Sequence, residues 1–202
     1  MTQPLRGVPH FVWAALVRQR QTGGLVPSQR FLIKKMIAPV PTGYRGTVME
    51  LGAGIGALTL RLAARCPEAR IVAWEVQPDL ARQARINLDE AGVGERVELI
   101  NGSAEDLIPD MKKRGIASAD YVISGVPLAN LGKARSENLI GSAFAALGSG
   151  GMYVQFQHST HHQEAIKARF DALRTATVLL NIPPAVVYYA TRFASSATSP
   201  LV

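Results

Sequence analysis

The sequence predicts an α/β fold: a doubly wound, mostly parallel sheet that ends in an antiparallel hairpin. From about residue 47, short runs rich in β-branched and apolar residues alternate with segments of helical periodicity. Such alternation is typical of βαβ units, which build parallel sheets with helices on both faces. The seven runs expected as strands are Thr47–Leu51, Arg70–Glu75, Arg96–Asn101, Ala119–Ser124, Gly151–His158, Thr175–Asn181 and Ala185–Arg192.

The connections between these runs indicate their directions. Helices are expected at Ala57–Cys66, Gln77–Ala91, Glu105–Lys113, Lys133–Leu147 and Thr160–Leu173. Strand–helix–strand crossovers of this kind are almost always right-handed. Only Ile182, Pro183 and Pro184 separate the last two strands, which is too short for a helical crossover. These two strands should therefore form the antiparallel hairpin at the sheet edge.

The front of the chain differs from the rest in charge. Residues 1–49 contain no Asp or Glu, and the rest of the chain has equal numbers of basic and acidic residues. After Ser28 as an N-cap, an amphipathic helix is expected with Arg30, Lys34 and Lys35 away from its apolar face. We expect residues 1–45 to form a basic helical lid or membrane-binding segment, 46–193 the α/β domain and 194–202 a flexible tail.

Composition limits the class of protein. A hydrophobic content of 48% excludes a disordered chain, and the single Cys66 cannot form an internal disulfide. No apolar run is long enough to span a membrane, and Arg18 and Arg20 follow the first apolar run instead of preceding it as in a signal peptide. These features predict a cytoplasmic protein, and the basic front end predicts peripheral association with the inner face of a membrane.

A glycine-rich turn follows the first expected strand. Glu50 precedes Gly52, Gly54 and Gly56, and this turn opens a helix. Glycines at alternate positions permit a sharp turn and the close approach of a ligand. Dinucleotide enzymes use a related pattern, but a carboxylate at Glu50 repels a pyrophosphate and suits the ammonium group of an amino-acid ligand. The pattern therefore favours S-adenosylmethionine over NAD.

Polar residues also end the next two strands. Glu75 lies about 20 residues beyond the turn, where a carboxylate can accept hydrogen bonds from both ribose hydroxyls. Ser103, Glu105 or Asp106 can accept a hydrogen bond from the adenine amino group, with Ala104 as a flat contact. Glu105 or Asp106 could equally cap the following helix.

In combination, these motifs resemble class I S-adenosylmethionine-dependent methyltransferases over about residues 45–160. The resemblance implies a Rossmann-like seven-stranded sheet with a reversed final hairpin, and S-adenosylmethionine as cofactor. The cofactor-binding residues that it implies are Gln29, Glu50, Gly52, Ala53, Gly54, Gly56, Glu75, Val76, Ser103, Ala104, Glu105, Ser124 and Gly125.

The loop after the fourth strand indicates the acceptor. Amino-base methyltransferases place Asn or Asp and then an aromatic residue there, whereas this chain has Gly125 and Leu128. Those side chains offer neither hydrogen bonding nor stacking for a base. This loop, with segments 102–107, 154–159 and 181–188, is similar to bacterial phospholipid N-methyltransferases. Residues 26–60 are also similar to rRNA adenine dimethyltransferases, so RNA adenine-N6 methylation is the alternative.

The phospholipid resemblance implies stepwise methylation of phosphatidylethanolamine toward phosphatidylcholine. The acceptor ammonium must lose a proton, and candidates for this step or for binding the cation are Tyr44, His158, Tyr188 and Tyr189. Residues expected to contact the lipid or the membrane are Trp13, Arg18, Arg20, Arg30, Lys34, Lys35 and Pro127.

No metal site is expected, because the adjacent His161 and His162 point in different directions on a helix and no further ligands cluster with them. We also expect a monomer that binds no nucleic acid. A protein that binds cofactor or lipid without catalysis is a third hypothesis, disfavoured by the complete glycine turn with Glu75.

Overall fold

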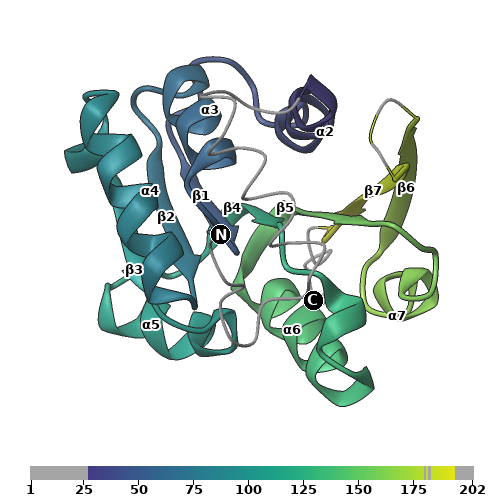
Figure 1. The fold of residues 1–202 in the computed structure, drawn as a ribbon. Coiled ribbons are helices and arrows are strands. Elements are labelled where there is room, and N and C mark those ends of the chain that lie inside the picture. The colour runs from purple at the N-terminus through teal and green to yellow at the C-terminus, as the bar shows by residue number, and fades with distance from the viewer. Residues whose placement is uncertain (1–26, 180, 182, 194–202) are drawn as a thin grey trace, which may run out of the picture.

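The computed structural model describes residues 27–179, 181 and 183–193. Its seven strands form one sheet in the order β3-β2-β1-β4-β5-β7-β6 (Figure 1). The strands are β1 (Thr47–Leu51), β2 (Arg70–Glu75), β3 (Val97–Asn101), β4 (Ala119–Ser124), β5 (Leu147–Gln157), β6 (Ala172–Val178) and β7 (Ala185–Thr191). β1 to β5 pair in parallel, and β7 pairs antiparallel with both β5 and β6. The predicted fold class is confirmed.

Helices cover both faces of this sheet. They are α2 (Pro27–Ile37), α3 (Ala57–Arg65), α4 (Pro78–Glu90), α5 (Leu107–Lys113), α6 (Lys133–Ala146) and α7 (Gln163–Lys167), with 3₁₀ turns η1 (Gly94–Arg96), η2 (Ala104–Asp106) and η3 (Leu128–Asn130). α2, α3 and α4 lie over one face, and α5, α6 and α7 lie over the other (Figure 1). Their apolar side chains belong to two separate core clusters. The parallel strands are therefore buried on both sides, as in other doubly wound sheets.

The front helix is part of this core. Leu32, Ile33 and Met36 of α2 are buried in the same cluster as Val48 of β1 and Val154 of β5. The hydroxyl of Tyr189 in β7 also donates a hydrogen bond to the Lys35 carbonyl oxygen at 2.9 Å. Thus α2 covers the sheet instead of standing apart from it. Trp13, Arg18 and Arg20 lie outside the described residues.

Several expected boundaries differ from the structure, first at β5, which begins at Leu147 instead of Gly151. The two segments that follow it differ as well. The helix expected at Thr160–Leu173 is reduced to α7, because Phe170 is buried and the chain enters β6 at Ala172. The expected strand at Thr175–Asn181 lies three residues earlier, since β6 pairs with β7 from Ala172↔Thr191 to Val178↔Ala185. Pairing in the hairpin, which is a tertiary contact, decides both boundaries.

Among the described residues, no helix combines the length and the hydropathy needed to cross a bilayer.

Candidate active site

A cavity of about 400 Å³ lies at the carboxyl ends of the parallel strands. This edge is where open α/β sheets bind ligands, because the loops that follow adjacent strands diverge there. The predicted cofactor residues that line the cavity are Gln29, Glu50, Gly52, Ala53, Gly54, Glu75, Val76, Ser103, Ala104, Glu105 and Gly125. Pro127 and His158 line it as well. Tertiary structure thus brings together residues from α2, β1, β2, β4, β5 and their loops.

The glycine turn forms the floor of the cavity. The backbone amides of Gly52 and Ala53 both donate to the Trp74 carbonyl oxygen, at 2.8 and 2.9 Å, which fixes the turn to β2. Gly54 has a φ of 59°, and a Cβ built on it would meet no protein atom within 4 Å. The turn therefore leaves open space above its backbone, in which a ligand fits. Gly56 is not among the lining residues.

Glu75, the last residue of β2, binds the backbone of the glycine turn. Its Oε2 accepts from the Gly54 amide at 2.7 Å, and its Oε1 accepts from the Gln77 amide at 2.9 Å. Burial raises the pKa of Glu75, and these backbone donors act in the opposite direction. Each carboxylate oxygen retains a second acceptor position, so the group can also bind hydroxyl donors of a ligand.

Glu50 is a second buried carboxyl group at the cavity. Its Oε2 accepts from the Thr59 hydroxyl at 2.6 Å. Burial raises its pKa to about 7; the Thr59 hydrogen bond lowers it and the charge of Glu75 raises it. A bound ammonium group beside Glu50 would favour the ionised form.

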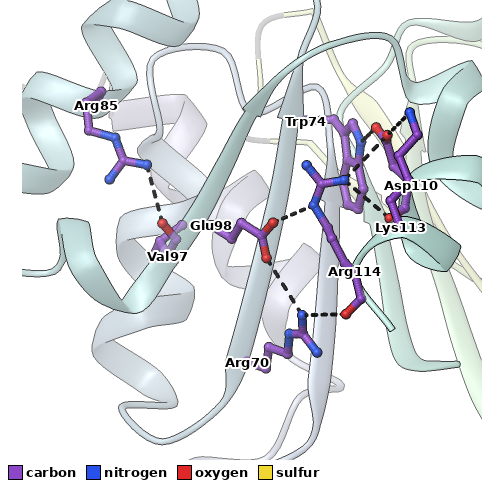
Figure 2. Close-up of polar contacts among 8 residues, drawn as sticks. All are labelled: Arg70, Trp74, Arg85, Val97, Glu98, Asp110, Lys113 and Arg114. Carbon is purple, nitrogen blue, oxygen red and sulfur yellow. Dashed lines mark hydrogen bonds and ion pairs between the residues drawn. The ribbon is translucent and has the colours of Figure 1, made fainter. Parts of the chain in front are cut away.

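Behind the turn, Trp74 is held by a polar network that reaches the surface (Figure 2). Its indole Nε1 donates to Asp110 Oδ2 at 3.1 Å, and Asp110 forms ion pairs with Arg114 at 3.4 Å and Lys113 at 3.5 Å. The Trp74 hydrogen bond and these cations lower the pKa of Asp110. Arg114 also pairs with Glu98. The network therefore holds the end of β2, which carries Glu75 and the Trp74 carbonyl oxygen that binds the glycine turn.

Ser103 caps the turn after β3. Its hydroxyl oxygen accepts from the Glu105 amide at 3.1 Å and caps η2, whereas Asp106 occupies the N-cap position of α5 without a side-chain hydrogen bond to that helix. The Glu105 side chain instead pairs with Arg135 Nε at 2.6 Å. Arg135 lines the cavity from the first turn of α6, and sequence analysis did not identify it.

The loop after β4 contacts the cofactor turn closely. A Cβ on Gly125 would lie 3.0 Å from the Gly52 carbonyl oxygen, so this position has no room for Asn or Asp unless the turn moves. Leu128 is fully buried in the core and does not reach the cavity. Ser124 is also buried, and its hydroxyl oxygen accepts from the Val126 amide at 3.3 Å. The structure thus offers no base-recognising side chain at these positions.

Two glutamines that sequence analysis did not assign hold this loop. Gln155 Nε2 donates to the Val126 carbonyl oxygen at 3.0 Å, and Gln157 Nε2 lies 3.4 Å from the same oxygen. Gln155 Oε1 in turn accepts from the Tyr153 hydroxyl at 2.6 Å. Their alternate spacing along a strand placed both amides on one face, which is the only signal in the sequence that could have identified them.

The acceptor side of the cavity is mainly apolar. Leu32, Ile33 and Met36 of α2 form one wall. Leu131, Leu139 and Phe156 lie at the cavity from α6, its preceding loop and β5. Of the α2 residues at the cavity, only Gln29 was predicted as a site residue; no role was predicted for Leu32, Ile33 or Met36. Arg30, Lys34 and Lys35 do not line the cavity; they are exposed on the outer side of α2.

The three candidate tyrosines do not reach the cavity, which corrects the sequence-based expectation. Tyr44 precedes β1, at the amino ends of the parallel strands, and packs edge-on against Tyr121. Tyr188 is fully buried, with its hydroxyl 3.3 Å from the Ser159 carbonyl oxygen, and Tyr189 binds α2. Burial raises the pKa of all three, so they stay protonated near neutral pH. Their positions do not support a role as the base.

His158 does lie at the cavity, directly after β5. Its Nδ1 is 3.0 Å from the Pro184 carbonyl oxygen. Because a carbonyl oxygen only accepts hydrogen bonds, this contact assigns a proton to Nδ1 and, in the neutral ring, the lone pair to Nε2. Of the four candidates for proton transfer, His158 alone is placed at the site.

The residues at the cavity fit S-adenosylmethionine. The open space above Gly54 accommodates a ligand, Glu75 offers acceptors for ribose hydroxyls, and Glu50 offers a carboxylate for the ammonium group. In the part of the chain that the structure describes, no three His, Cys, Asp or Glu residues are grouped to hold a metal ion.

Comparisons with known proteins agree with this geometry. A family model described as a methyltransferase domain matches residues 48–151. An ornithine lipid N-methyltransferase from Singulisphaera acidiphila is 29% identical over 167 residues, which are 82% of this chain and 85% of that protein.

Solved structures show the same fold. An RNA methyltransferase from Salinibacter ruber, in complex with S-adenosyl-L-homocysteine, superposes with a TM-score of 0.58 at 23% identity over 88% of this chain and all of the other. A 16S rRNA N2 methyltransferase from T. thermophilus, in complex with AdoMet and guanosine, gives a TM-score of 0.64 at 22% identity over 85% of this chain and 44% of the other.

Proposed function

We propose a lipid substrate for this chain, which belongs to the methyltransferase-domain family and uses S-adenosylmethionine. In this proposal it methylates the amine of phosphatidylethanolamine at a membrane surface, stepwise toward phosphatidylcholine. The observation that carries the proposal is the acceptor side of the cavity. Apolar side chains of α2 form its wall, and the loop after β4 has Gly125, where a Cβ would lie 3.0 Å from the Gly52 carbonyl oxygen, in place of the polar residue that base methyltransferases use. The lipid N-methyltransferase relative, which aligns with 82% of the chain, supports a lipid amine as acceptor.

In the proposed complex, several of the predicted cofactor residues at the cavity have defined tasks. Glu75 accepts from the ribose hydroxyls, Glu50 balances the ammonium group, and the backbone at Gly52 and Gly54 permits close approach. Ser103, Ala104 and Glu105 surround the adenine. When bound, S-adenosylmethionine supplies an electrophilic methyl group on a positively charged sulfur.

The chain's task in catalysis is to position and deprotonate the acceptor amine. Leu32, Ile33 and Met36 exclude water from the cavity wall, and desolvation lowers the pKa of an ammonium group. His158 is proposed as the residue that accepts the amine proton, because of the four candidates it alone lines the cavity, directly after β5. Positioning the freed lone pair then contributes to the rate by reducing the entropy cost of the encounter.

The basic residues outside the cavity are proposed to bind lipid. Arg30, Lys34 and Lys35 are exposed on α2 and can bind the lipid phosphate or anionic neighbours. Trp13, Arg18 and Arg20 are proposed to anchor the chain at the headgroup region. The protein is proposed to act peripherally at the cytoplasmic face of the membrane, as a monomer and without nucleic acid.

The test uses radiolabelled S-adenosylmethionine with three acceptors in parallel: phosphatidylethanolamine vesicles, ornithine lipid vesicles and total RNA. We expect label in mono- and dimethylated phosphatidylethanolamine after thin-layer separation. Label only in ornithine lipid would replace the proposed substrate within the lipid class. Label in RNA and in neither lipid would overturn the proposal in favour of the adenine-N6 alternative.

A further inference from the structure

Three exposed apolar side chains lie at the carboxyl end of the parallel strands, where the cavity is: one on α2, one after β2 and one after β6. Of the large apolar residues that the structure describes, Phe31 is 47% exposed, Val76 62% and Leu179 75%. Val76 follows β2 and lines the cavity, and Leu179 follows β6. Because β6 and β7 are antiparallel, as are β7 and β5, β6 runs in the same direction as the parallel strands and ends at the same edge.

Phe31 belongs to the same edge through α2. This helix lines the cavity with Leu32, Ile33 and Met36, and contacts β6 and β7 (Figure 1). The Tyr189 hydroxyl donates a hydrogen bond to the Lys35 carbonyl oxygen of α2 at 2.9 Å. Phe31 and Leu179 therefore stand on two elements that pack together, and Val76 lies on another strand end of the same edge.

The charge beside Phe31 is positive. Lys34 and Lys35 are three and four residues after Phe31, so they share its side of the helix, and α2 contains no acidic residue. Two acidic residues near the cavity are each paired with an arginine: Asp79 pairs with Arg82 at 2.8 Å, and Glu105 pairs with Arg135 at 2.6 Å. Carboxyl groups remain at the cavity itself, on Glu50 and Glu75, so the positive part of this end of the sheet is the exposed side of α2.

Resting on the proposed function, we propose that this rim, formed by Phe31, Val76 and Leu179 with Arg30, Lys34 and Lys35, docks on an anionic lipid bilayer. Interleaved apolar and cationic side chains are typical of surfaces that bind at the headgroup boundary. Phe31 and Leu179 enter the interface, and the cations contact lipid phosphates. The cavity then opens toward the bilayer, so a lipid amine reaches it without leaving the membrane.

The test measures binding of the full chain to vesicles of phosphatidylcholine and phosphatidylglycerol, which contain no primary amine. We expect the double variant Phe31→Ser, Leu179→Ser to bind about tenfold more weakly, because both side chains lose the free energy of apolar burial. The matched control is Ile86→Ser with Phe193→Ser, which removes exposed apolar side chains on α4 and after β7. It should bind like the parent chain.

A fluorescence measurement at a single position tests whether the rim enters the membrane. A fluorophore sensitive to polarity is attached at Leu179→Cys, with Ile86→Cys as the matched position, and Cys66 is only 1% exposed. We expect a blue shift on adding vesicles at position 179 and none at 86. Equal shifts at both positions, or equal vesicle binding by rim and control variants, would overturn the rim. Cofactor binding by calorimetry verifies that every variant is folded.

The two proposals fail separately. Vesicle binding through the rim without methylation of phosphatidylethanolamine would leave the rim in place and overturn the proposed function. Methylation of phosphatidylethanolamine with rim variants that bind like the parent would do the reverse.

Discussion

The two halves of the active site are built in different ways. On the cofactor side, Glu50, the glycine turn and Glu75 lie within 26 residues of sequence and are held by backbone hydrogen bonds between β1 and β2. On the acceptor side, the wall combines α2, the loop after β4, the start of α6 and the end of β5. A binding site for a common cofactor can be local in sequence, whereas the acceptor pocket depends on how distant elements pack.

The first prediction concerns the cofactor side, where we expect the largest effect. Glu75→Ala removes the carboxylate that holds Gly54 and is proposed to bind ribose. Loss of two charged hydrogen bonds costs about 3 kcal/mol, so the affinity for S-adenosylhomocysteine should fall about 100-fold in calorimetry. Vesicle binding should stay unchanged, because Glu75 is not in the rim. Unchanged cofactor affinity would contradict the assignment of Glu75 to the cofactor side of the site.

The second prediction tests the contact between the halves. Gly125→Asn introduces the polar residue of base methyltransferases at a position where its Cβ lies 3.0 Å from the Gly52 carbonyl oxygen. Overpacking of about 2 kcal/mol should weaken cofactor binding about 30-fold. Gly125→Ala, with the same Cβ, is the matched control for side-chain polarity and should show a similar loss. Gain of RNA methylation by the Asn variant would contradict the steric account.

The third prediction separates the acceptor side from the cofactor side. Gln155→Leu leaves the Val126 carbonyl without its shorter side-chain hydrogen bond, so the loop beside the acceptor loses a constraint. We expect kcat with lipid to fall about tenfold, corresponding to about 1.4 kcal/mol, with little change in cofactor affinity. Tyr153→Phe removes the hydroxyl that donates to Gln155 Oε1 but keeps the hydrogen bond from Gln155 to Val126, so it should have a smaller effect. An equal loss of cofactor affinity in Gln155→Leu would show that the glutamine acts on both halves.

The fourth prediction concerns pH, for which we expect the smallest change in cofactor affinity. The pKa of Glu50 rises from 4.5 to about 7 on folding, because burial disfavours its charge. Between these two values the unfolded chain binds fewer protons than the folded one. The free energy of unfolding should therefore fall as pH rises from about 4.5 to about 7, by up to about 3 kcal/mol, and then level off.

Cofactor affinity should follow the opposite trend, because an ammonium group prefers ionised Glu50. We expect a rise of less than tenfold in affinity for S-adenosylhomocysteine from pH 6 to pH 8. Glu50→Gln should flatten both profiles, in thermal unfolding and in calorimetry. A variant with the parent's pH dependence would assign the titration to another group.

The parts of the site that were predictable follow from local spacing. Gly52, Gly54 and Glu75 were identified because a strand, a turn and the next strand end fix their relation within one βαβ unit. Tyr44 is adjacent to the same strand but at its other end, so proximity in sequence suggested a position that the strand direction excludes. Gln155, Gln157 and Arg135 were missed because their roles depend on contacts across the sheet.

The sequence by itself determined the sheet class, the final hairpin and the cofactor turn, because hydrophobic periodicity and glycine spacing act over short stretches of chain. Only the tertiary structure decided that α2 forms a cavity wall, that Tyr188 and Tyr189 are structural, and that Phe31, Val76 and Leu179 share one edge. These facts depend on strand order and direction, which bring residues more than 100 positions apart into contact.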